Sequence, residues 1–418
     1  MLLSRKTIIQ LNETQANIVG HMNYAASKLW NVCNYERQHY KELDLSKYPD
    51  WYYQKAQHKE NMWYKALPSQ TAQEVCKVLD QAWRSFYRLQ KTGGIENPRP
   101  PRYKQQGIVI TYMQNGIVHE AESETVRLTL SKQLKEYMKE AYDVHDNYLY
   151  LKNRIFKSMN SIKQLHIYPP EEDGSSQVIV VYEVPDVKMQ EDNGRYLSID
   201  LGLHNLLTCY DNEGRSFILG RRYLSICRKY DKEMARLQSQ WGKCQSAQGM
   251  KYPKPSKHQR KVQRKKNNSI RDYLHKMTRY VVEYCKEQEI HTVVIGDITG
   301  IRKGKNLGRQ TNQKLHGLPY ARIYTQLEYK LAMNGIRMIR QEESYSSQCS
   351  PYSEKVSKEY AEGRNRCMRG LYKEEECIYQ ADAVGAYNIL RKYSNKSAKE
   401  IKLPVMGLSD LKVIKVAV

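Results

Sequence analysis

Apolar and polar positions in the first half of the chain follow strand-like spacing, then helical spacing, then strand-like spacing again. Residues 1–12 have the pattern of a strand. Apolar residues recur every three or four positions over 14–43 and about 67–91, which predicts two helices. Short β-type runs dominate from about 107 to 185. The pattern therefore predicts two helices in front of a β-rich region.

From residue 195 the pattern changes to strands that alternate with helices. Strands are predicted over 195–200, about 205–210, 215–219, 291–297 and 336–339. Helices are predicted over about 221–241, 268–288 and 319–334, and a last helix begins at Asp382. Three strands followed by alternating helices and strands predict a mixed sheet with flanking helices, so the fold class is α+β.

Two acidic residues stand where predicted elements end or begin. Asp200 ends the apolar strand and is followed closely by Gly202, whereas Asp382 opens the last helix. A carboxylate at a bare strand end lets a cation and a phosphate approach, which is typical of nucleases. Taken singly, Asp200 could simply end a strand and Asp382 could cap a helix. Their occurrence together on a very basic chain favours a shared metal site.

The charge balance indicates a polyanionic partner. The 418 residues include 68 Lys or Arg and 45 Asp or Glu, which gives a net charge of +23. Solubility does not require such an excess, and long nucleic acid is the natural partner. No apolar run reaches the roughly 18 residues that span a membrane. The nine cysteines follow no disulfide framework, which favours a reducing cytosol.

Two basic segments are candidate nucleic-acid surfaces. Prolines extend the segment 97–104, which can follow a phosphate backbone or serve as a stiff linker. The stretch 251–266 holds eight Lys or Arg, and its alternative is a solvated charged face. The candidate binding residues are Arg99, Arg102, Lys104, Lys251, Lys254, Lys257, Arg260, Lys261, Arg264, Lys265 and Lys266.

Four motifs in a fixed order resemble the split RuvC nuclease of TnpB proteins and the compact type V CRISPR effectors. They are DLGLHNL at 200–206, IGDITGI at 295–301, YSSQC at 345–349 and DAVGAYNIL at 382–390. The resemblance covers about 195–390 well and the amino-terminal half more loosely. It implies an RNase H-like (RuvC) mixed sheet, a bound guide RNA, and metal-dependent cleavage of guide-matched DNA.

The resemblance also implies a division of the chain. Residues 1–190 are expected to form a β-rich wedge and a helical recognition lobe that bind the guide RNA and the flanking motif. The RuvC part is expected over 191–345, with a basic helical insertion at about 221–288. A degenerate zinc-ribbon-like loop that contacts target nucleic acid is expected over 346–380. The closing RuvC helix and a tail are expected over 381–418.

The position of the middle acid departs from the family. A glutamate usually precedes the aspartate of the strand motif, but here that position is Gly296. Some members have Gly or Pro there and a compensating glutamate several dozen residues later, which Glu343 matches. An acid on the neighbouring strand starts about 4.8 Å away, within reach of a Glu side chain, and Gly296 leaves room for it. The alternative is that Glu343 lies at the surface and the nuclease is inactive. Asp297 and Glu342 are rivals for the same role.

The zinc ribbon also departs from the family. Cys349, Cys367 and Cys377 stand alone, and Tyr352 occupies the place of a partner cysteine. Tetrahedral zinc needs four ligands, so no zinc is expected. A three-cysteine site with an outside ligand is the alternative.

The resemblance implies two-metal phosphodiester hydrolysis with magnesium. Asp200 is expected to bridge both ions, and Glu343 and Asp382 to hold one each. The expected partners are a guide RNA and target double-stranded DNA in a prokaryotic cytoplasm, with a homodimer on one guide RNA as an option. Two alternatives stay open: a guided DNA-binding regulator without cleavage, and a transposon-associated DNA-strand-transfer enzyme.

Overall fold

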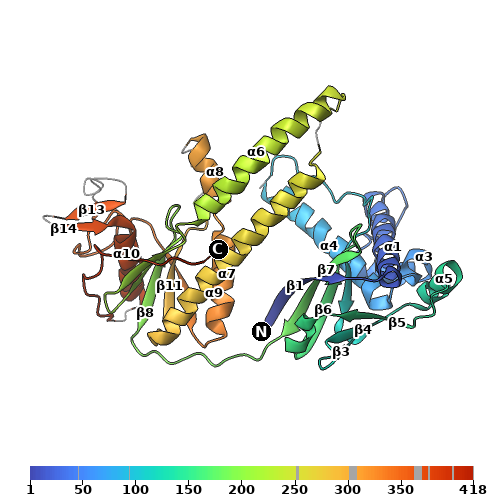
Figure 1. Cartoon of the computed structure of the whole chain (residues 1–418), viewed down its shortest axis with the longest axis horizontal. Coiled ribbons are helices and arrows are strands. Elements are labelled where there is room, and N and C mark those ends of the chain that lie inside the picture. Colours follow the sequence, from blue (N-terminus) through green and yellow to red (C-terminus); the bar gives the residue numbers. More distant parts are fainter. Residues whose placement is uncertain are drawn as a thin grey trace. The chain divides into compact units, whose positions relative to one another are not determined.

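The chain is described by a computed structural model that divides into two compact units (Figure 1). Unit 1 is Met1–Asp186 and unit 2 is Val187–Val418, and each is treated by itself. The structure describes residues 1–45, 47–93, 95–250, 254–300, 308–361, 370–374, 377–397 and 400–417, without the side chains of 309–311. Two predicted site residues, Lys251 and Cys367, lie outside these described residues.

Unit 1 combines two antiparallel sheets with helices. One sheet has the order β1-β7-β6-β2 and the other β3-β4-β5. The strands are β1 (Leu2–Gln10), β2 (Ile110–Met113), β3 (Ile117–Glu120), β4 (Thr125–Thr129), β5 (Tyr148–Lys152), β6 (Ser161–Ile167) and β7 (Ser175–Glu183). The helices are α1 (Glu13–Gln38), α2 (Trp51–Gln57), α3 (Met62–Lys65), α4 (Ser69–Thr92) and α5 (Lys132–Tyr142), with short 3-10 turns at His58–Glu60, Gln114–Gly116 and Arg154–Ser158.

Helix α1 is specified by a capping box and fixed by a buried ion pair. Asn12 accepts a hydrogen bond from the backbone of Gln15 (2.8 Å), and the Gln15 side chain accepts one from the Asn12 backbone (3.0 Å). At the other end, the Arg37 guanidinium donates to Asp80 of α4 (2.9 Å) with both side chains buried. The pair sets the contact between α1 and α4, and α1 ends at Gln38, short of the predicted limit.

The predicted β-rich region contains a helix that the sequence pattern missed. Helix α5 begins after Ser131, whose hydroxyl accepts a hydrogen bond from the backbone of Leu134 (3.2 Å). Leu134 and Met138 are its buried residues, four positions apart as a helix requires. This short amphipathic signal is surrounded by strands, which explains why the pattern of the whole region favours β structure.

Unit 2 is built on a six-stranded mixed sheet of order β12-β11-β8-β9-β10-β15. Strands β8, β9 and β10 form an antiparallel meander, whereas β11 and β12 run parallel to β8. The strands are β8 (Tyr196–Asp200), β9 (Leu207–Asp211), β10 (Ser216–Leu219), β11 (Thr292–Asp297), β12 (Arg337–Glu342) and β15 (Lys412–Val413). A separate hairpin joins β13 (Leu371–Glu374) to β14 (Cys377–Gln380).

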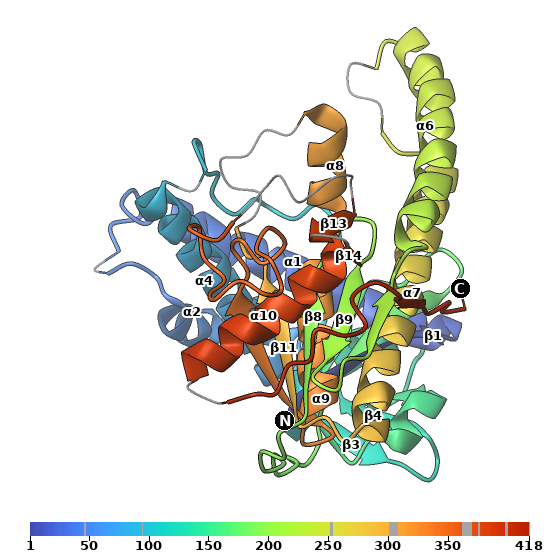
Figure 2. The ribbon, with the colours of Figure 1, turned by 90° about the vertical axis from the view of Figure 1, so that its left-hand side faces the viewer.

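The two faces of this sheet are covered by different helices. The helices are α6 (Tyr223–Ala247), α7 (Lys257–Glu287), α8 (Arg309–Gly317), α9 (Tyr320–Ala332) and α10 (Ala381–Ser397). Ile199 of β8 and Ile295 of β11 are buried with residues of α7 and α9, whereas Val294 is buried with α10. Figure 2 shows α10 crossing in front of β8, β9 and β11. Strand side chains alternate, so Asp200 and Gly296, which follow Ile199 and Ile295, are on the α10 face.

Helix α7 corrects the prediction for the basic stretch. The helix begins at Lys257, so the residues expected to form a basic stretch before a helix at 268 are the first turns of the helix itself. Ser256 and Gln259 form a capping box at its start. Helix α6 packs against the first half of α7 (Figure 1). The dense lysines and arginines hide the apolar spacing of Val262 and Ile270 in the sequence.

The predicted mixed sheet with flanking helices is confirmed. Helices α6, α9 and α10 were predicted at nearly their observed positions, and β12 extends further than predicted, to Glu342. Among the described residues, no helix is long and apolar enough to cross a membrane.

Candidate active site and nucleic-acid surfaces

Asp200 lies at the end of β8, where the sheet meets α10. The paired register of β8 and β11 runs to Ile199↔Ile295, so Asp200 and Gly296 are the next residues on the two strands. A Cβ built on Gly385 of α10 would lie 2.9 Å from Oδ2 and 3.3 Å from Cγ of Asp200. Glycine inside a helix costs about 1 kcal/mol relative to alanine. At position 385 its lack of a side chain lets the Asp200 carboxylate approach the helix.

Glu343 fills the space that Gly296 leaves. It directly follows β12, which lies parallel to β11 with Gln341 opposite Gly296. A Cβ built on Gly296 would overlap the Oε2 atom of Glu343 and would lie 3.4 Å from its Cδ. The same Cβ would lie 3.0 Å from Cδ1 of Ile389 on α10, and Oε2 itself is buried. The Glu343 carboxylate thus lies where a side chain at position 296 would begin, on the α10 face.

The two rival acids have other partners. Asp297 accepts a hydrogen bond from the backbone of Thr299 (2.9 Å), which closes a turn after β11. Glu342 accepts hydrogen bonds from the ammonium of Lys392 and the backbone of Ser344. Partial burial opposes ionisation of Glu342, but these two donors outweigh it and lower its pKa. Asp297 and Glu342, which lie opposite each other on β11 and β12, are therefore used in local structure.

Tyr324 of α9 fixes the backbone at the end of β11. Its hydroxyl donates to the carbonyl of Gly296 (2.6 Å) and accepts from the backbone N–H of Ile298 (3.1 Å). Burial, together with the charges of Asp297 and Glu343, raises the pKa of Tyr324 to about 12. The hydroxyl stays neutral at ordinary pH and keeps donating to Gly296.

Asp382 lies in the first turn of α10 and is held by a side-chain amide. The Nδ2 atom of Asn205 donates to Oδ2 of Asp382 (2.7 Å), and Nε of Arg221 donates to Oδ1 of Asn205 (3.0 Å). Asn205 is only 8% exposed. The position also places the carboxylate at the positive end of the helix dipole.

Helix α10 also holds the segment that follows Glu343. Asn388, which is fully buried, donates to the carbonyls of Ser346 (2.7 Å) and Cys349 (2.8 Å). Arg391 donates to the carbonyls of Ser350 (3.0 Å) and Ser353. Its burial lowers the pKa of Arg391. One helix therefore carries Asp382, lies next to Asp200 at Gly385, and anchors the loop beyond Glu343.

The structure brings the three predicted acids to the same helix but does not gather them into a cluster. Within the described ranges, no group of three or more His, Cys, Asp or Glu side chains is assembled to hold a metal ion. Like charges repel, so three carboxylates do not converge closely without a cation. The donor set consists of carboxylate oxygens, the ligands that magnesium prefers, and in kind these residues fit such an ion.

The predicted basic residues from Lys257 to Lys266 lie in the amino-terminal half of α7. Lys257, Arg260, Lys261, Arg264 and Lys265 are exposed, and Lys254 is exposed just before the helix. Lys266 is half-buried and is paired with Asp231 of α6. Trp241 of α6 donates to the carbonyl of Lys254 (2.9 Å), which ties the segment before α7 to the neighbouring helix. The described residues of the predicted basic stretch thus lie in or just before one half of a helix, and all of them but Lys266 are exposed.

The basic segment of unit 1 is fixed along α1 through its backbone. Asn31 exchanges hydrogen bonds with the backbone of Lys104 (2.6 and 2.8 Å), and Trp30 donates to the carbonyl of Arg102 (3.1 Å). The Lys104 ammonium lies 4.6 Å from the centre of the Trp30 ring. The side chains of Arg99 and Arg102 are exposed. These contacts fix the backbone of the segment and leave the guanidinium groups of Arg99 and Arg102 exposed, and the alternative of a stiff linker stays open.

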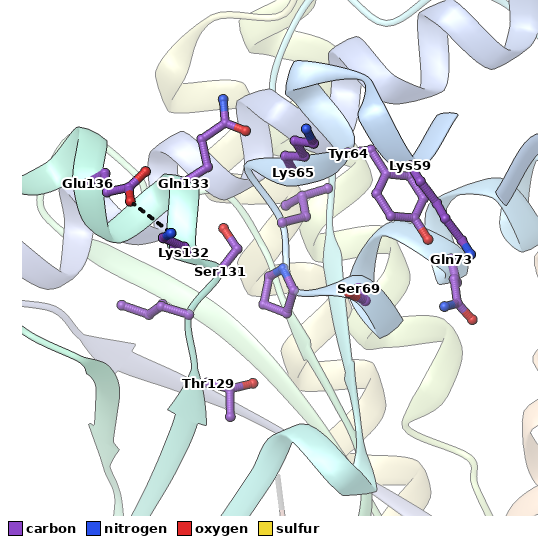
Figure 3. A pocket seen from close by; sticks show the side chains of 13 residues that line it. Lys59, Tyr64, Lys65, Ser69, Gln73, Thr129, Ser131, Lys132, Gln133 and Glu136 are labelled. Atoms are coloured by element: carbon purple, nitrogen blue, oxygen red, sulfur yellow. Dashed lines mark ion pairs between the residues drawn. The ribbon is translucent and has the colours of Figure 1, made fainter. Parts of the chain in front are cut away.

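Unit 1 also has a cavity of about 960 Å³ (Figure 3). It lies between the start of α4 at Ser69 and the start of α5 after Ser131, and Lys59, Lys65 and Lys132 line it. Lys132 pairs with Glu136 at 3.8 Å. Sequence reasoning did not single out this cavity, because its lining comes from segments far apart in the chain.

The described cysteines of the predicted degenerate ribbon lie in different surroundings. Cys349 is buried, and its thiol donates to the carbonyl of Ser357 (3.3 Å). Burial raises the pKa of the Cys349 thiol. Cys377 is exposed at the start of β14.

Two protein-family models match separate segments of the chain. Residues 179–302 match OrfB_IS605, described as a probable transposase, and 320–389 match the Cas12f1-like TNB domain. They confirm the predicted resemblance to TnpB and the compact type V effectors. No curated protein matches the chain in sequence.

Solved structures are similar to the chain at low sequence identity. The cryo-EM structure of a Cas12f1–sgRNA–target DNA complex is similar with a TM-score of 0.59 and 12% identity, over 90% of this chain and 83% of that chain. A CRISPR-Cas12f ternary complex matches with a TM-score of 0.36 and 14% identity, over 89% of this chain and 80% of that chain. The first likeness shows that this chain shares the α+β fold of a Cas12f effector.

Three residues that sequence reasoning missed support the predicted acids. Gly385, Asn205 and Arg221 contact the acids or each other at the site. Gly385 and Asn205 lie inside the motifs DAVGAYNIL and DLGLHNL, so a signal was present in the sequence. Their contacts depend on how α10 packs on the sheet, which spacing along the chain does not specify.

Proposed function

We propose that this chain, a relative of TnpB and the compact type V effectors, is an RNA-guided DNA endonuclease. Asp200, Glu343 and Asp382 are the proposed catalytic acids, and magnesium is the proposed metal. The observation that carries the proposal is the Glu343 carboxylate in the space over Gly296, beside the strand that ends in Asp200. The alternative, an inactive nuclease with Glu343 at the surface, would not need a carboxylate in the space that Gly296 leaves.

The strand order supports an RNase H-like (RuvC) fold for unit 2. An antiparallel meander, β8-β9-β10, is followed by β11 and β12 parallel to the first strand, with helices on both faces. In this assignment α6 and much of α7 are the basic helical insertion, and the segment 346–380 is the degenerate ribbon. Unit 1 would supply the β-rich wedge and the helical recognition lobe.

The three acids would hold two magnesium ions at the α10 face. Bound ions would supply charge neutralisation for in-line displacement at a phosphodiester. Asp200 would be shared between the ions, and Glu343 and Asp382 would each serve one. Gly385 and Gly296 let two of the acids approach α10, and Asn205 holds the third.

The nucleic-acid partners would be a guide RNA and target double-stranded DNA. The structure with a TM-score of 0.59 is of a complex with both kinds of partner. In this chain the exposed amino-terminal half of α7 would bind phosphates, and Arg99 and Arg102 would bind them in unit 1. Sequence choice would come from guide pairing, with unit 1 reading a short flanking motif. A homodimer on one guide RNA stays a prediction.

Cleavage of a matched plasmid tests the proposal. RNA that co-purifies with the protein is sequenced, and a plasmid carrying the matching target is incubated with the complex in magnesium. Asp200→Ala and Asp382→Ala are each expected to abolish cleavage while RNA and target binding stay nearly intact. Asp410→Ala removes an exposed carboxylate from the same unit and should cut normally. Cleavage by Asp200→Ala or Asp382→Ala within about tenfold of the unchanged protein would remove that residue from the site.

A strand-transfer enzyme is the second candidate, because the family model over 179–302 is described as a probable transposase. The same three acids would serve that reaction, since strand transfer replaces the attacking water by a DNA 3′ hydroxyl. Joined products from labelled transposon ends would favour it, and cut but unjoined products would favour the endonuclease.

A further inference from the structure

Asn205, which donates to Asp382, and Arg221, which donates to Asn205, come from either side of one β-hairpin. Strands β9 and β10 pair as far as Leu207↔Leu219, and Asn205 and Arg221 lie two residues beyond that pair. Gly220 has a φ of 92°, and a Cβ built there would overlap the Leu206 side chain. Glycine at 220 therefore lets the chain close against Leu206. The close approach brings the Arg221 side chain within hydrogen-bonding distance of Asn205.

The turn after β8 places Asn205 in the same way. A Cβ built on Gly202 would lie 2.6 Å from the Asn205 carbonyl oxygen, so any side chain at 202 would open the turn. With Gly202 the turn returns under the start of α10, and the buried amide donates to Asp382 (2.7 Å). Asp200 and the support of Asp382 thus share one short segment.

Arg221 determines which end of the Asn205 amide faces the carboxylate. A guanidinium only donates hydrogen bonds, so its partner atom must be the amide oxygen. The amide nitrogen then faces Oδ2 of Asp382 and donates to it. With the amide reversed, oxygen would face oxygen and nitrogen would face guanidinium, and both contacts would be repulsive. The hydrogen bond uses one acceptor position of Oδ2 and leaves the other carboxylate oxygen for a ligand.

We propose that Asn205 is a positioning residue for Asp382, and that Arg221 acts only through Asn205 by fixing the amide. The inference rests on the proposed role of Asp382 as a metal-holding acid. Neither side chain is assigned contact with the reacting atoms. Groups that orient metal ligands change metal affinity by roughly 10- to 100-fold when they are removed.

The test is a magnesium titration of plasmid cleavage by the full-length protein with its co-purified RNA. Asn205→Ala is expected to raise the magnesium concentration for half-maximal rate by roughly 10- to 100-fold, with the rate largely recovered at saturating magnesium. Arg221→Ala should shift it in the same direction by a smaller factor. The double variant should match Asn205→Ala, because Arg221 has no role once the amide is gone. Arg228→Ala is the control. It removes an exposed charge further along the chain, in α6, and should leave the magnesium midpoint unchanged.

The affinity of the RNA-free protein for manganese, measured by electron paramagnetic resonance, gives a readout that does not need cleavage. Asn205→Ala should weaken it by a similar factor and Arg228→Ala should not. An unchanged midpoint in Asn205→Ala would overturn the inference. Shifts that add up in the double variant would overturn the part assigned to Arg221. If Asn205→Ala does not fold, the exposed Arg221→Ala still decides the question, since an unchanged midpoint there contradicts the coupling.

The outcome for Asp382→Ala separates this inference from the proposed function. If Asp382→Ala abolishes cleavage and Asn205→Ala behaves as the unchanged protein, only the positioning role fails. If Asp382→Ala itself cuts normally, the proposed function fails whatever Asn205 does.

Discussion

The α10 face of the sheet and the amino-terminal half of α7 are two charged regions in the described part of unit 2, and they are built in opposite ways. At the α10 face each acid has its own neighbour: Gly385 for Asp200, Gly296 for Glu343, Asn205 for Asp382. Along the amino-terminal half of α7 the basic side chains are exposed, and their proposed role, phosphate binding, would be shared among them. A change of a single side chain at the α10 face should therefore affect cleavage. Along α7, only combined substitutions should affect RNA binding.

Glu343→Gln is expected to have the largest effect. Gln keeps the shape that fills the space over Gly296 but removes the charge, so cleavage should stop as completely as with Asp200→Ala. Glu342→Gln is the matched neighbour, and plasmid cleavage by it should fall only mildly because Glu342 serves Lys392 and Ser344. Full cleavage by Glu343→Gln would reject the assignment and make Asp297 or Glu342 the next residue to test.

Moving the acid back to β11 sharpens the same point. Gln at 343 would still fill the space, so the receiving background must be Glu343→Ala. Gly296→Glu in that background should restore part of the cleavage, whereas Gly296→Glu alone should place two carboxylates in one space and give none. If Gly296→Glu cleaves equally well alone and in the Glu343→Ala background, the space at position 296 does not determine which strand can supply the acid.

Gly296→Ala should come next in size. The added methyl group would overlap the Glu343 carboxylate and press on Ile389, so Glu343 must move. Displacing a reacting group by about 1 Å costs up to about 100-fold in rate. The rate of plasmid cleavage measures the loss, and thermal unfolding checks the fold. A rate within about twofold of the unchanged protein would contradict the steric argument.

Gly385→Ala should separate activity from stability. Alanine improves an α-helix by about 1 kcal/mol over glycine, so unfolding by denaturant should show equal or greater stability. The new methyl group would lie 2.9 Å from Oδ2 of Asp200, and cleavage should fall by about tenfold. Gly242→Ala is the control in α6, where a Cβ meets nothing within 4 Å. A loss of both stability and activity would mean that Gly385 serves packing alone.

Single substitutions along α7 should have small effects, and the combined one should change the salt dependence of binding. Neutralising Lys257, Arg260, Lys261, Arg264 and Lys265 together should weaken binding of the co-purified RNA. Each lost phosphate contact should reduce the log–log salt slope by about 0.7 to 0.9. Lys276→Gln with Lys286→Gln, which removes two ion-paired charges from the same helix, should leave the slope unchanged. An unchanged slope in the fivefold variant would make this half of α7 a solvated face.

Chelation should have the smallest effect on the fold. Asn388 and Arg391 hold the segment after Glu343 by direct hydrogen bonds, so the loop does not depend on a zinc ion for that anchor. Purified protein is expected to carry less than one equivalent of zinc by elemental analysis, and circular dichroism should not change in chelator. Stoichiometric zinc whose removal unfolds the protein would show an intact ribbon.

The sequence predicted the positions of Asp200 and Asp382 because each of these acids borders an apolar run. Asp200 lies at the end of β8, and Asp382 in the first turn of α10, as their flanking patterns indicated. The adjacency of β11 and β12, on which the argument for Glu343 depended, is also observed. These features follow from local periodicity and from one assumption about strand order.

The rest could not be predicted because it depends on packing between distant segments. The spacing of the motifs does not predict that Gly385 lies next to Asp200. It also does not predict that Asn205 donates to Asp382, which lies 177 residues further along the chain. The start of α7 was missed because charge hides a sparse apolar stripe, and α5 because it is short and lies among strands. The roles of the acids and of the basic residues stay predictions until the variants are measured.

Helix α7 has a consequence for how the protein opens. It is one uninterrupted helix of 31 residues, but its buried positions from Ile270 to Cys285 crowd its second half. Amide protons in the first half should exchange with solvent quickly, through local fraying of the helix. Those in the second half should exchange slowly, because their exchange requires unfolding of unit 2. A polyanion bound to the first half would suppress the fraying, and protection would then spread along the helix toward the core. Hydrogen exchange along this one element would thus map bound nucleic acid without any label on the ligand.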